Sequence, residues 1–164
     1  MGKASSKAKV TLQPLAKGLS GTAGQYFVAA ELSRRGIIAT VTLRNARGID
    51  VLASSATRLV SIQVKTNQYA ARKWLLDKKA EVSVADDLFY IFVNLNGSGG
   101  VPTYHVVESR EVARQIRASH REWLAGNKKD GGPRKDTNMR VFLDPNDKHL
   151  NAWEQLGFLL SRLW

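Results

Sequence analysis

The stretch GIDVLASSATRLVSIQVKT, residues 48–66, holds two short apolar runs on either side of a polar turn. Alternation in the second run predicts a strand, in which successive side chains point to opposite faces. Gln63 and Lys65 then share one face, and the Ile and Val between them share the other. If the two runs pair as a hairpin, Asp50 lies beside Gln63 and Lys65. An acid, an amide oxygen and an ammonium group at one spot on a sheet are suited to holding a metal ion and a phosphate together.

Outward from this hairpin, the pattern of apolar residues and turn residues predicts one mixed α/β domain over residues 21–164, after a basic, flexible N-terminal tail over residues 1–20. A helix that precedes three strands is expected to pack on the sheet. The expected helices cover residues 21–35, 109–124 and 151–162, and the expected strands cover residues 37–43, 49–53, 59–66, 88–95, 103–107 and 139–143. Asp86 and Asp87 are interpreted as turn residues at a strand entry.

The helix over residues 21–35 carries a polar residue in the middle of its apolar face. At about 100° per residue, Gln25 falls on the same side as Val28 and Leu32, whereas Glu31 falls roughly 120° away from Gln25. A polar side chain at the centre of a core-facing stripe needs a hydrogen-bond partner. Two alternatives stay open: Gln25 bonds to nearby backbone, or it points over the sheet toward Asp50.

The charge balance favours a polyanionic partner. Lys and Arg number 25 against 14 Asp and Glu, which gives a formal net charge of +11 in 164 residues. A field of this sign attracts nucleic acid. The candidate nucleic-acid contacts are Arg44, Arg47, Thr66, Arg72, Lys73, Lys78, Lys79, Arg110, Arg114, Arg117 and Arg121. Trp74 among these cations suits either a nucleic-acid surface or the core, and the Arg110 to Arg121 stripe suits either an anion or plain solvation.

Several classes are disfavoured by what the sequence lacks. There is no cysteine, so disulfides and thiolate metal sites are excluded. The three histidines, His105, His120 and His149, do not form a closely spaced metal motif. No apolar run approaches the ~20 residues that span a bilayer, and no signal-peptide pattern opens the chain. A soluble, cytoplasmic protein is the expectation.

The hairpin residues match the needs of phosphodiester hydrolysis. That reaction needs an activated water and neutralisation of charge on phosphate oxygens, both of which Mg²⁺ supplies. Mg²⁺ takes hard oxygen ligands, for which the candidates are the Asp50 carboxylate, the Gln63 amide and the Val64 backbone carbonyl. Lys65 is then placed to orient the attacking water or to stabilise the developing charge.

The sequence resembles the PD-(D/E)xK nuclease superfamily, which includes restriction enzymes and archaeal Holliday junction resolvases, over roughly residues 21–79. GIDVLA matches the strand with the family's Asp at Asp50, and SIQVKT matches its acid-x-Lys strand at Gln63 and Lys65. The resemblance implies a restriction-endonuclease-like core with a mixed sheet flanked by helices, dependence on Mg²⁺ or Mn²⁺, a DNA substrate and a possible homodimer. Gln63 replaces the acid of the acid-x-Lys motif, and the helix acid falls on Gln25, with Glu31 as a possible substitute.

Three functions follow from these observations. The first is a metal-dependent DNA endonuclease or resolvase-like enzyme that uses Asp50, Gln63 and Lys65. The second is a nuclease fold without catalysis that binds nucleic acid, which the two glutamines favour. The third is an interaction protein for an acidic partner, with the C-terminal tryptophans Trp123, Trp153 and Trp164 as interface anchors; core packing is the alternative for these tryptophans.

Overall fold

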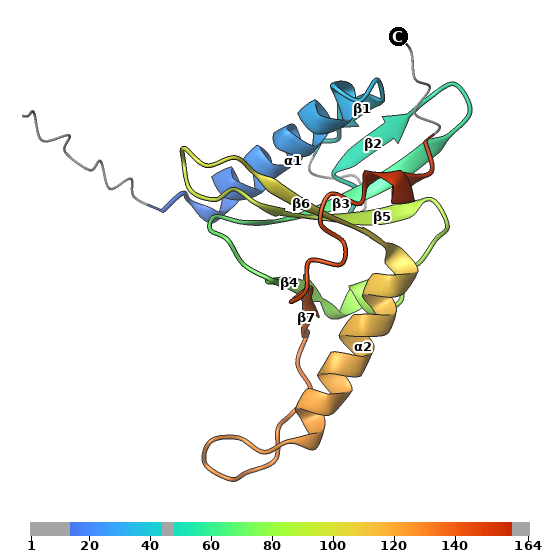
Figure 1. Cartoon of the computed structure of the whole chain (residues 1–164). Coiled ribbons are helices and arrows are strands. Elements are labelled where there is room, and N and C mark those ends of the chain that lie inside the picture. Colours follow the sequence, from blue (N-terminus) through green and yellow to red (C-terminus); the bar gives the residue numbers. More distant parts are fainter. Residues whose placement is uncertain (1–13, 44–47, 159–164) are drawn as a thin grey trace, which may run out of the picture.

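The computed structural model describes residues 14–43 and 48–158 (Figure 1). Its helices are α1 (Lys17–Ser33) and α2 (Ser109–Ala125), with short 3-10 helices η1 (Lys78–Glu81) and η2 (Trp153–Leu156). Its strands are β1 (Ile38–Val41), β2 (Val51–Ser54), β3 (Leu59–Asn67), β4 (Lys73–Asp77), β5 (Leu88–Asn94), β6 (Thr103–Glu108) and β7 (Met139–Leu143). The predicted basic tail and residues Arg44, Arg47 and Trp164 lie outside the described residues, apart from residues 14–20.

The central sheet has five strands in the order β1-β2-β3-β5-β6. β3 runs parallel to β5, and every other neighbouring pair in this sheet is antiparallel. The parallel pair requires a crossover, and the chain between β3 and β5 supplies β4 and η1. β4 pairs with β7 in a separate two-stranded sheet. The mixed central sheet flanked by helices confirms the predicted fold class.

Each face of the central sheet has its own apolar core. α1 covers one face, where Val28 and Leu32 pack with Ile62 and Val64 of β3. α2 and the β4–β7 sheet cover the other face (Figure 1), where Phe92 stacks on Phe142 and the Trp74 ring packs at a tilt against both. Trp74 is 1% exposed, so it belongs to the core and not to a nucleic-acid surface. Gln63 and Lys65 are in register with Tyr90 and Phe92 of β5, which places both side chains on the α2 side of the sheet.

α1 sits unusually close to β3 at one glycine. A Cβ at Gly24 would lie 2.0 Å from the Thr66 hydroxyl oxygen, so only glycine permits this approach. The next residue of the helix, Gln25, reaches Asp50, which directly precedes β2. α1 begins at Lys17, four residues before the predicted start, and the chain turns at Gly36 with a φ of +77°.

The predicted C-terminal helix over residues 151–162 is wrong for the residues described. The chain forms only the 3-10 turn η2, because Gly157 adopts a left-handed conformation with a φ of +67° directly after it. Trp153 is nevertheless buried, as predicted for core packing. Trp123, for which core packing was the alternative to an interface, is 42% exposed because α2 extends past the sheet. No helix among the described residues is long and apolar enough to cross a bilayer.

Candidate functional site

Asp50 is held where the pairing between β2 and β3 ends. The last paired residues are Val51 and Ile62. The next N–H of β3 that faces β2 therefore has no partner on that strand. The Asp50 carboxylate accepts this N–H, from Val64, at 2.7 Å through Oδ2. Its other oxygen, Oδ1, accepts a hydrogen bond from Gln25 Nε2 at 2.9 Å. Gln25 therefore points over the sheet to Asp50, and α1 and β3 together fix the carboxylate.

The environment of Asp50 disfavours its charge. Burial raises the pKa of Asp50 above the ordinary 3.8, and the Val64 N–H, the Lys65 ammonium and the Gln25 amide oppose this rise without cancelling it. The surroundings therefore leave the charged form of Asp50 incompletely compensated. A further cation beside Asp50 would stabilise the carboxylate, and a raised pKa of this origin is common at functional sites.

Gln63 lines a small cavity on the α2 side of β3. Its Nε2 lies 3.5 Å from the position of a Cβ on Gly48, so the side chain lies against the start of the hairpin. The cavity has a volume of about 230 Å³ and is also lined by Ser83 and Asp87. Asp87 therefore brings a carboxylate to the space beside Gln63. It does so from the turn before β5, where the sequence predicted only a turn role.

Glu31 is engaged elsewhere. Its carboxylate pairs with Arg34 at 2.9 Å and with Arg35 at 3.2 Å, both on or just after its own helix. No hydrogen bond or ion pair joins Glu31 to Asp50 in the part of the chain that the structure describes. The structure thus brings Gln25 to Asp50 and leaves Glu31 with the two arginines.

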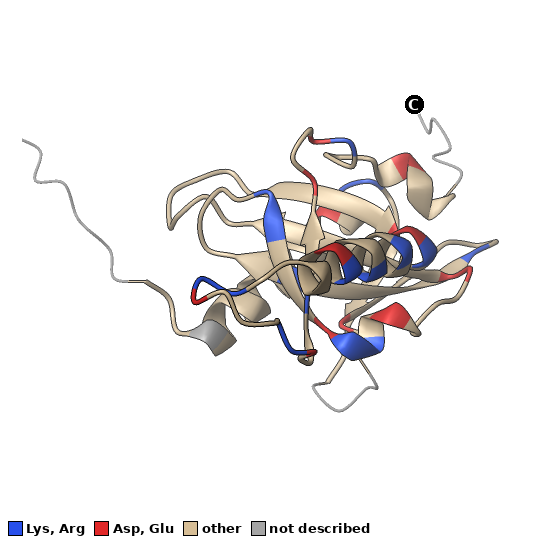
Figure 2. Cartoon of the chain, turned by 90° about the horizontal axis from the view of Figure 1, so that it is seen from below, with Lys and Arg blue, Asp and Glu red and all other residues tan. Residues whose placement is uncertain are grey.

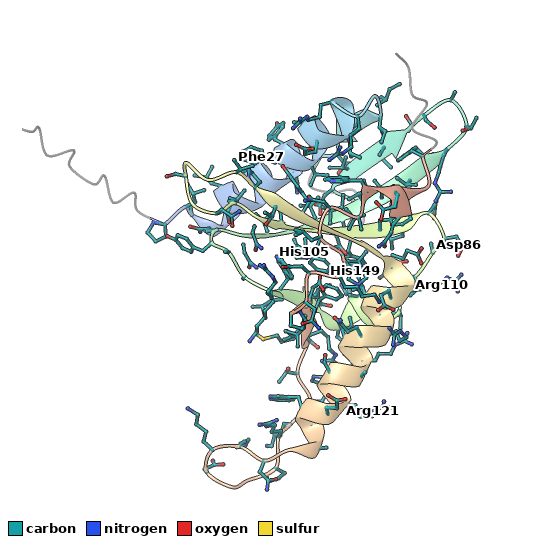
Figure 3. The ribbon with its side chains drawn as sticks, viewed as in Figure 1. Phe27, Asp86, His105, Arg110, Arg121 and His149 are labelled. Carbon is teal, nitrogen blue, oxygen red and sulfur yellow. The ribbon has the colours of Figure 1, made fainter. Side chains whose placement is uncertain are left out.

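The candidate nucleic-acid contacts divide into neutralised and free cations. Four of them pair with carboxylates: Arg72 with Asp147, Lys78 with Asp136, Arg110 with Asp86, and Arg114 with Glu111. Arg117 donates to the Glu81 carbonyl, and Thr66 packs against Gly24. Over the described residues, Lys73, Lys79 and Arg121 have no carboxylate partner. In Figure 2 blue segments alternate with red and tan ones along α2, and Figure 3 shows Arg110 beside Asp86 at one end and Arg121 nearer the other.

A second buried polar cluster joins β6 to the segment after β7, around His105 and His149 (Figure 3). His105 Nδ1 lies 2.7 Å from Asp144 Oδ2, and the Lys148 and His149 backbone N–H groups donate to the same carboxylate at 2.9 and 3.0 Å. His105 Nε2 lies 3.8 Å from Asp147 Oδ1. Residues 39 apart in sequence are involved, so no local spacing could have predicted this cluster.

The ligand types in this cluster, one imidazole and two carboxylates within 4.8 Å of one another, suit a divalent cation. Arg72 already supplies a cation there: its Nη2 donates to Asp147 Oδ2 at 2.7 Å, and its Nε lies 2.5 Å from Oδ1 without hydrogen-bond geometry. Burial raises the pKa of Asp144, but the hydrogen bonds from His105, His149 and Lys148 outweigh it, so the pKa is lowered. Asp144 is therefore compensated and ties the C-terminal segment to the sheet, whereas His105 Nε2, Asp147 Oδ1 and His149 Nδ1 are buried without a hydrogen-bond partner among the described residues.

Comparison with solved structures identifies the fold. A bacterial homing endonuclease superimposes with a TM-score of 0.51 at 12% identity, over 85% of this chain and 89% of that one. A Holliday junction resolvase from Archaeoglobus fulgidus gives a TM-score of 0.45 at 9% identity, over 76% of this chain and 84% of the other. No protein-family model matches the sequence, and no curated protein sequence matches it. The chain has a restriction-endonuclease-like fold.

Proposed function

We propose that the protein is a metal-dependent nuclease that hydrolyses phosphodiester bonds in DNA. The observation that carries this proposal is the Asp50 carboxylate, which is held by Gln25 and Val64, lies near Lys65, and remains incompletely compensated. The restriction-endonuclease-like fold, found in a homing endonuclease as well, supports it. The net charge of +11 supports a nucleic acid as the substrate.

The donor atoms around Asp50 fit a hard cation. Asp50, Gln25 and Gln63 offer only oxygen donors beside amide N–H groups, which suits Mg²⁺ or Mn²⁺ better than soft metals. Two of the roughly four lone-pair positions of the Asp50 carboxylate are used by hydrogen bonds, so others remain for a metal. We propose Asp50, Gln63 and the Val64 carbonyl as the ligands. With one carboxylate among them, the affinity should be low until a DNA phosphate adds negative charge.

Side chains of the protein supply the other contributions to phosphodiester hydrolysis. A bound Mg²⁺ would supply charge for a phosphate oxygen and a more acidic water. Lys65 contributes a positive charge on the same face of β3 as Gln63 and stabilises the charge that develops on the phosphate. Gln25 orients the Asp50 carboxylate through its Nε2. Glu31 has no part in this arrangement, because Arg34 and Arg35 hold it.

A cleavage assay tests this function. Supercoiled plasmid, branched DNA and single strands are incubated with the protein and Mg²⁺ or Mn²⁺, alongside the Asp50→Asn and Lys65→Ala variants. We expect cleavage that needs the metal and that both substitutions abolish. Cleavage that is absent, or unchanged in both variants, contradicts the proposal.

The second candidate is a nucleic-acid-binding protein of nuclease fold without catalysis. One observation favours it: the Gln25 amide, a neutral group, occupies the side of Asp50 from which a second acid would add charge. This alternative predicts salt-dependent DNA binding that survives Asp50→Ala and no metal-dependent turnover. Homodimer formation, which would pair two such sites, remains part of the first proposal and is measured by sedimentation.

A further inference from the structure

The far end of α2 and the outer face of the β4–β7 sheet form a continuous groove away from Asp50. Two adjoining cavities, of about 370 and 410 Å³, share Trp123 and Thr137 in their walls. In Figure 1 this end of α2 and the loop after it project beyond the central sheet. We call the combined surface the distal groove. Its walls consist of Lys73, Leu75, Ser119, His120, Trp123, Lys128, Lys129, Arg134, Lys135, Thr137, Met139, Val141 and Leu143.

The floor of the distal groove is apolar and open. The β4–β7 sheet buries one face, with Trp74 and Phe142, and turns the other face outward. On that outward face Leu75 is 55% exposed and Met139 is 56% exposed. Apolar side chains that are this exposed on neighbouring strands are typical of a surface that binds a ligand or another macromolecule.

The rim of the groove is cationic. Lys128, Lys129, Arg134 and Lys135 line one cavity, and no carboxylate lines either cavity. Among the described residues, none of these four cations has a carboxylate partner. Asp136 lies next to this rim in sequence but is occupied by Lys78, His120 and Arg140. The groove therefore presents uncompensated positive charge to solvent.

Planar groups stack where the two cavities meet. The Arg134 guanidinium lies over the Trp123 ring, with its carbon 5.1 Å from the ring centroid, and Arg134 Nη1 donates to the Trp123 carbonyl at 2.6 Å. The His120 ring stacks on Trp123 with centroids 5.4 Å apart and planes 20° from parallel. A Cβ at Gly126 would lie 2.9 Å from Arg134 Nη1, so this glycine leaves room for the guanidinium. The stack is thus preformed on the protein.

We propose that the distal groove binds unpaired nucleotides of a DNA substrate, with bases against the planar stack and the apolar floor and phosphates on the cationic rim. This inference rests on the proposed function for the identity of the substrate as DNA. Base-paired DNA shows phosphates and base edges but hides its base faces. Only unpaired bases offer flat apolar faces together with a string of negative charges.

Charge decides against a second copy of this chain in the same groove. A two-fold symmetric contact would place the same surface of both copies together. It would bring two uncompensated sets of Lys128, Lys129, Arg134 and Lys135 into one interface, and like charges oppose such a contact. A polyanion neutralises them.

The test is a binding measurement without metal ions, so that it does not depend on cleavage. Fluorescence anisotropy in EDTA compares a labelled single strand, a duplex with a single-stranded branch, and a blunt duplex. We expect Trp123→Ala to weaken binding of the first two by about ten-fold, the scale of one base–aromatic stack. Trp123→Phe, which keeps a flat ring, should stay within about three-fold of wild type, and blunt-duplex affinity should not change.

The cationic rim is tested through salt dependence. Lys128→Ala combined with Lys129→Ala should lower the slope of log affinity against log salt by about 1.4 on the single strand, because each phosphate contact contributes about 0.7. The matched control removes two exposed cations outside the groove, Arg34→Ala with Lys148→Ala, and should leave the slope unchanged. Circular dichroism verifies that each variant is folded.

Three results overturn the inference. The first is an unchanged single-strand affinity in Trp123→Ala and in the double lysine variant. The second is an equal loss on blunt duplex, which would make the groove a general backbone contact. The third is sedimentation that shows a dimer in wild type and a monomer in Trp123→Ala, which would assign the groove to self-association. Failure of the nuclease proposal gives a different pattern: no cleavage by wild type, with the strand-binding differences intact.

Discussion

Asp50 and Asp144 are both carboxylates that accept hydrogen bonds from backbone N–H groups, but their surroundings shift the carboxyl pKa in opposite directions. Asp144 receives hydrogen bonds from His105 and from two backbone N–H groups, and its pKa is lowered despite burial. Asp50 receives one backbone N–H and one neutral amide, and burial raises its pKa. The first carboxylate is fully compensated by the fold, and the second is not.

The difference separates a structural carboxylate from a functional one. A compensated charge stabilises the native state and needs no further ligand. An incompletely compensated charge lowers stability, and proteins keep such groups where a substrate or metal completes them. Asp50 lies near Lys65 in the hairpin over residues 48–66, whereas Asp144 fastens the C-terminal segment to β6. The predictions below use substitutions that separate these two roles.

The largest effect is expected for Asp50→Asn on cleavage. The asparagine can still accept the Val64 N–H, so the hairpin geometry is kept while the charge is lost. DNA cleavage should fall by about a thousand-fold or more. The free energy of unfolding at pH 7 should equal or exceed that of wild type, because a buried charge is removed. A variant that cleaves normally, or that is clearly less stable, contradicts a functional role for this carboxylate.

Asp144→Ala should have the reverse profile. It leaves His105 and two backbone N–H groups without their acceptor, and breaking such a buried pair costs about 3–5 kcal/mol of unfolding free energy. Cleavage per folded molecule should stay close to wild type. Urea denaturation measures the first quantity and an assay corrected for the folded fraction measures the second. Equal stability, or a specific loss of cleavage in the folded protein, would break the comparison.

Gly24→Ala tests the contact that brings α1 to the site. The new methyl group would meet the Thr66 hydroxyl, and relief of such overpacking costs about 1–3 kcal/mol. Because Gln25 follows directly, cleavage should fall as well. Gly21→Ala is the matched control: no atom lies within 4 Å of a Cβ at Gly21, on the same helix. Similar behaviour of the two variants would show that the close approach is unimportant.

Gln63→Glu sharpens the account of the metal. A second carboxylate on the face shared with Lys65 should raise Mg²⁺ affinity by about ten-fold through added Coulomb attraction. Isothermal titration on wild type, Gln63→Glu and the off-site control Gln115→Glu measures this change. Equal affinities in all three proteins would place the metal away from Gln63.

The two carboxylates should also respond oppositely to pH. The lowered pKa of Asp144 contributes stability above about pH 3.8, which is lost as the pH falls through the folded-state value. The raised pKa of Asp50 contributes stability below about pH 3.8, which is lost as the pH rises through its folded-state value. The stability advantage of Asp50→Asn should therefore grow above pH 4. The stability advantage of the wild type over Asp144→Asn should shrink below pH 4.

The elements with local signals were predictable from sequence. The alternation of apolar and polar residues predicted β3. The hairpin predicted from it placed Asp50 beside that strand, and the helical wheel placed Gln25 on the side of α1 that faces the sheet. The close approach at Gly24 follows from tertiary packing, so the wheel gave a direction for Gln25 but could not decide between backbone and Asp50 as its partner. The role of Arg34 and Arg35 in holding Glu31 depends on side-chain geometry and not on spacing.

Long-range polar contacts were beyond the sequence. Asp144, Asp147 and His149 stand close together in the chain, but their partners are His105 in β6 and Arg72 just before β4. Asp87 reaches the cavity beside Gln63 only because β5 runs parallel to β3. The prediction of a C-terminal helix was wrong because it relied on the apolar spacing over residues 151–162 and gave too little weight to Gly157. The left-handed conformation of this glycine ends the 3-10 turn η2.

The most direct test is anomalous diffraction from a crystal soaked in Mn²⁺, which examines both carboxylates in a single map. The account predicts a Mn²⁺ peak bonded to the Asp50 carboxylate and a Gln63 or Val64 oxygen. It predicts none between His105 and Asp147, where Arg72 supplies the cation. A peak at His105 and Asp147 with nothing at Asp50 would contradict it.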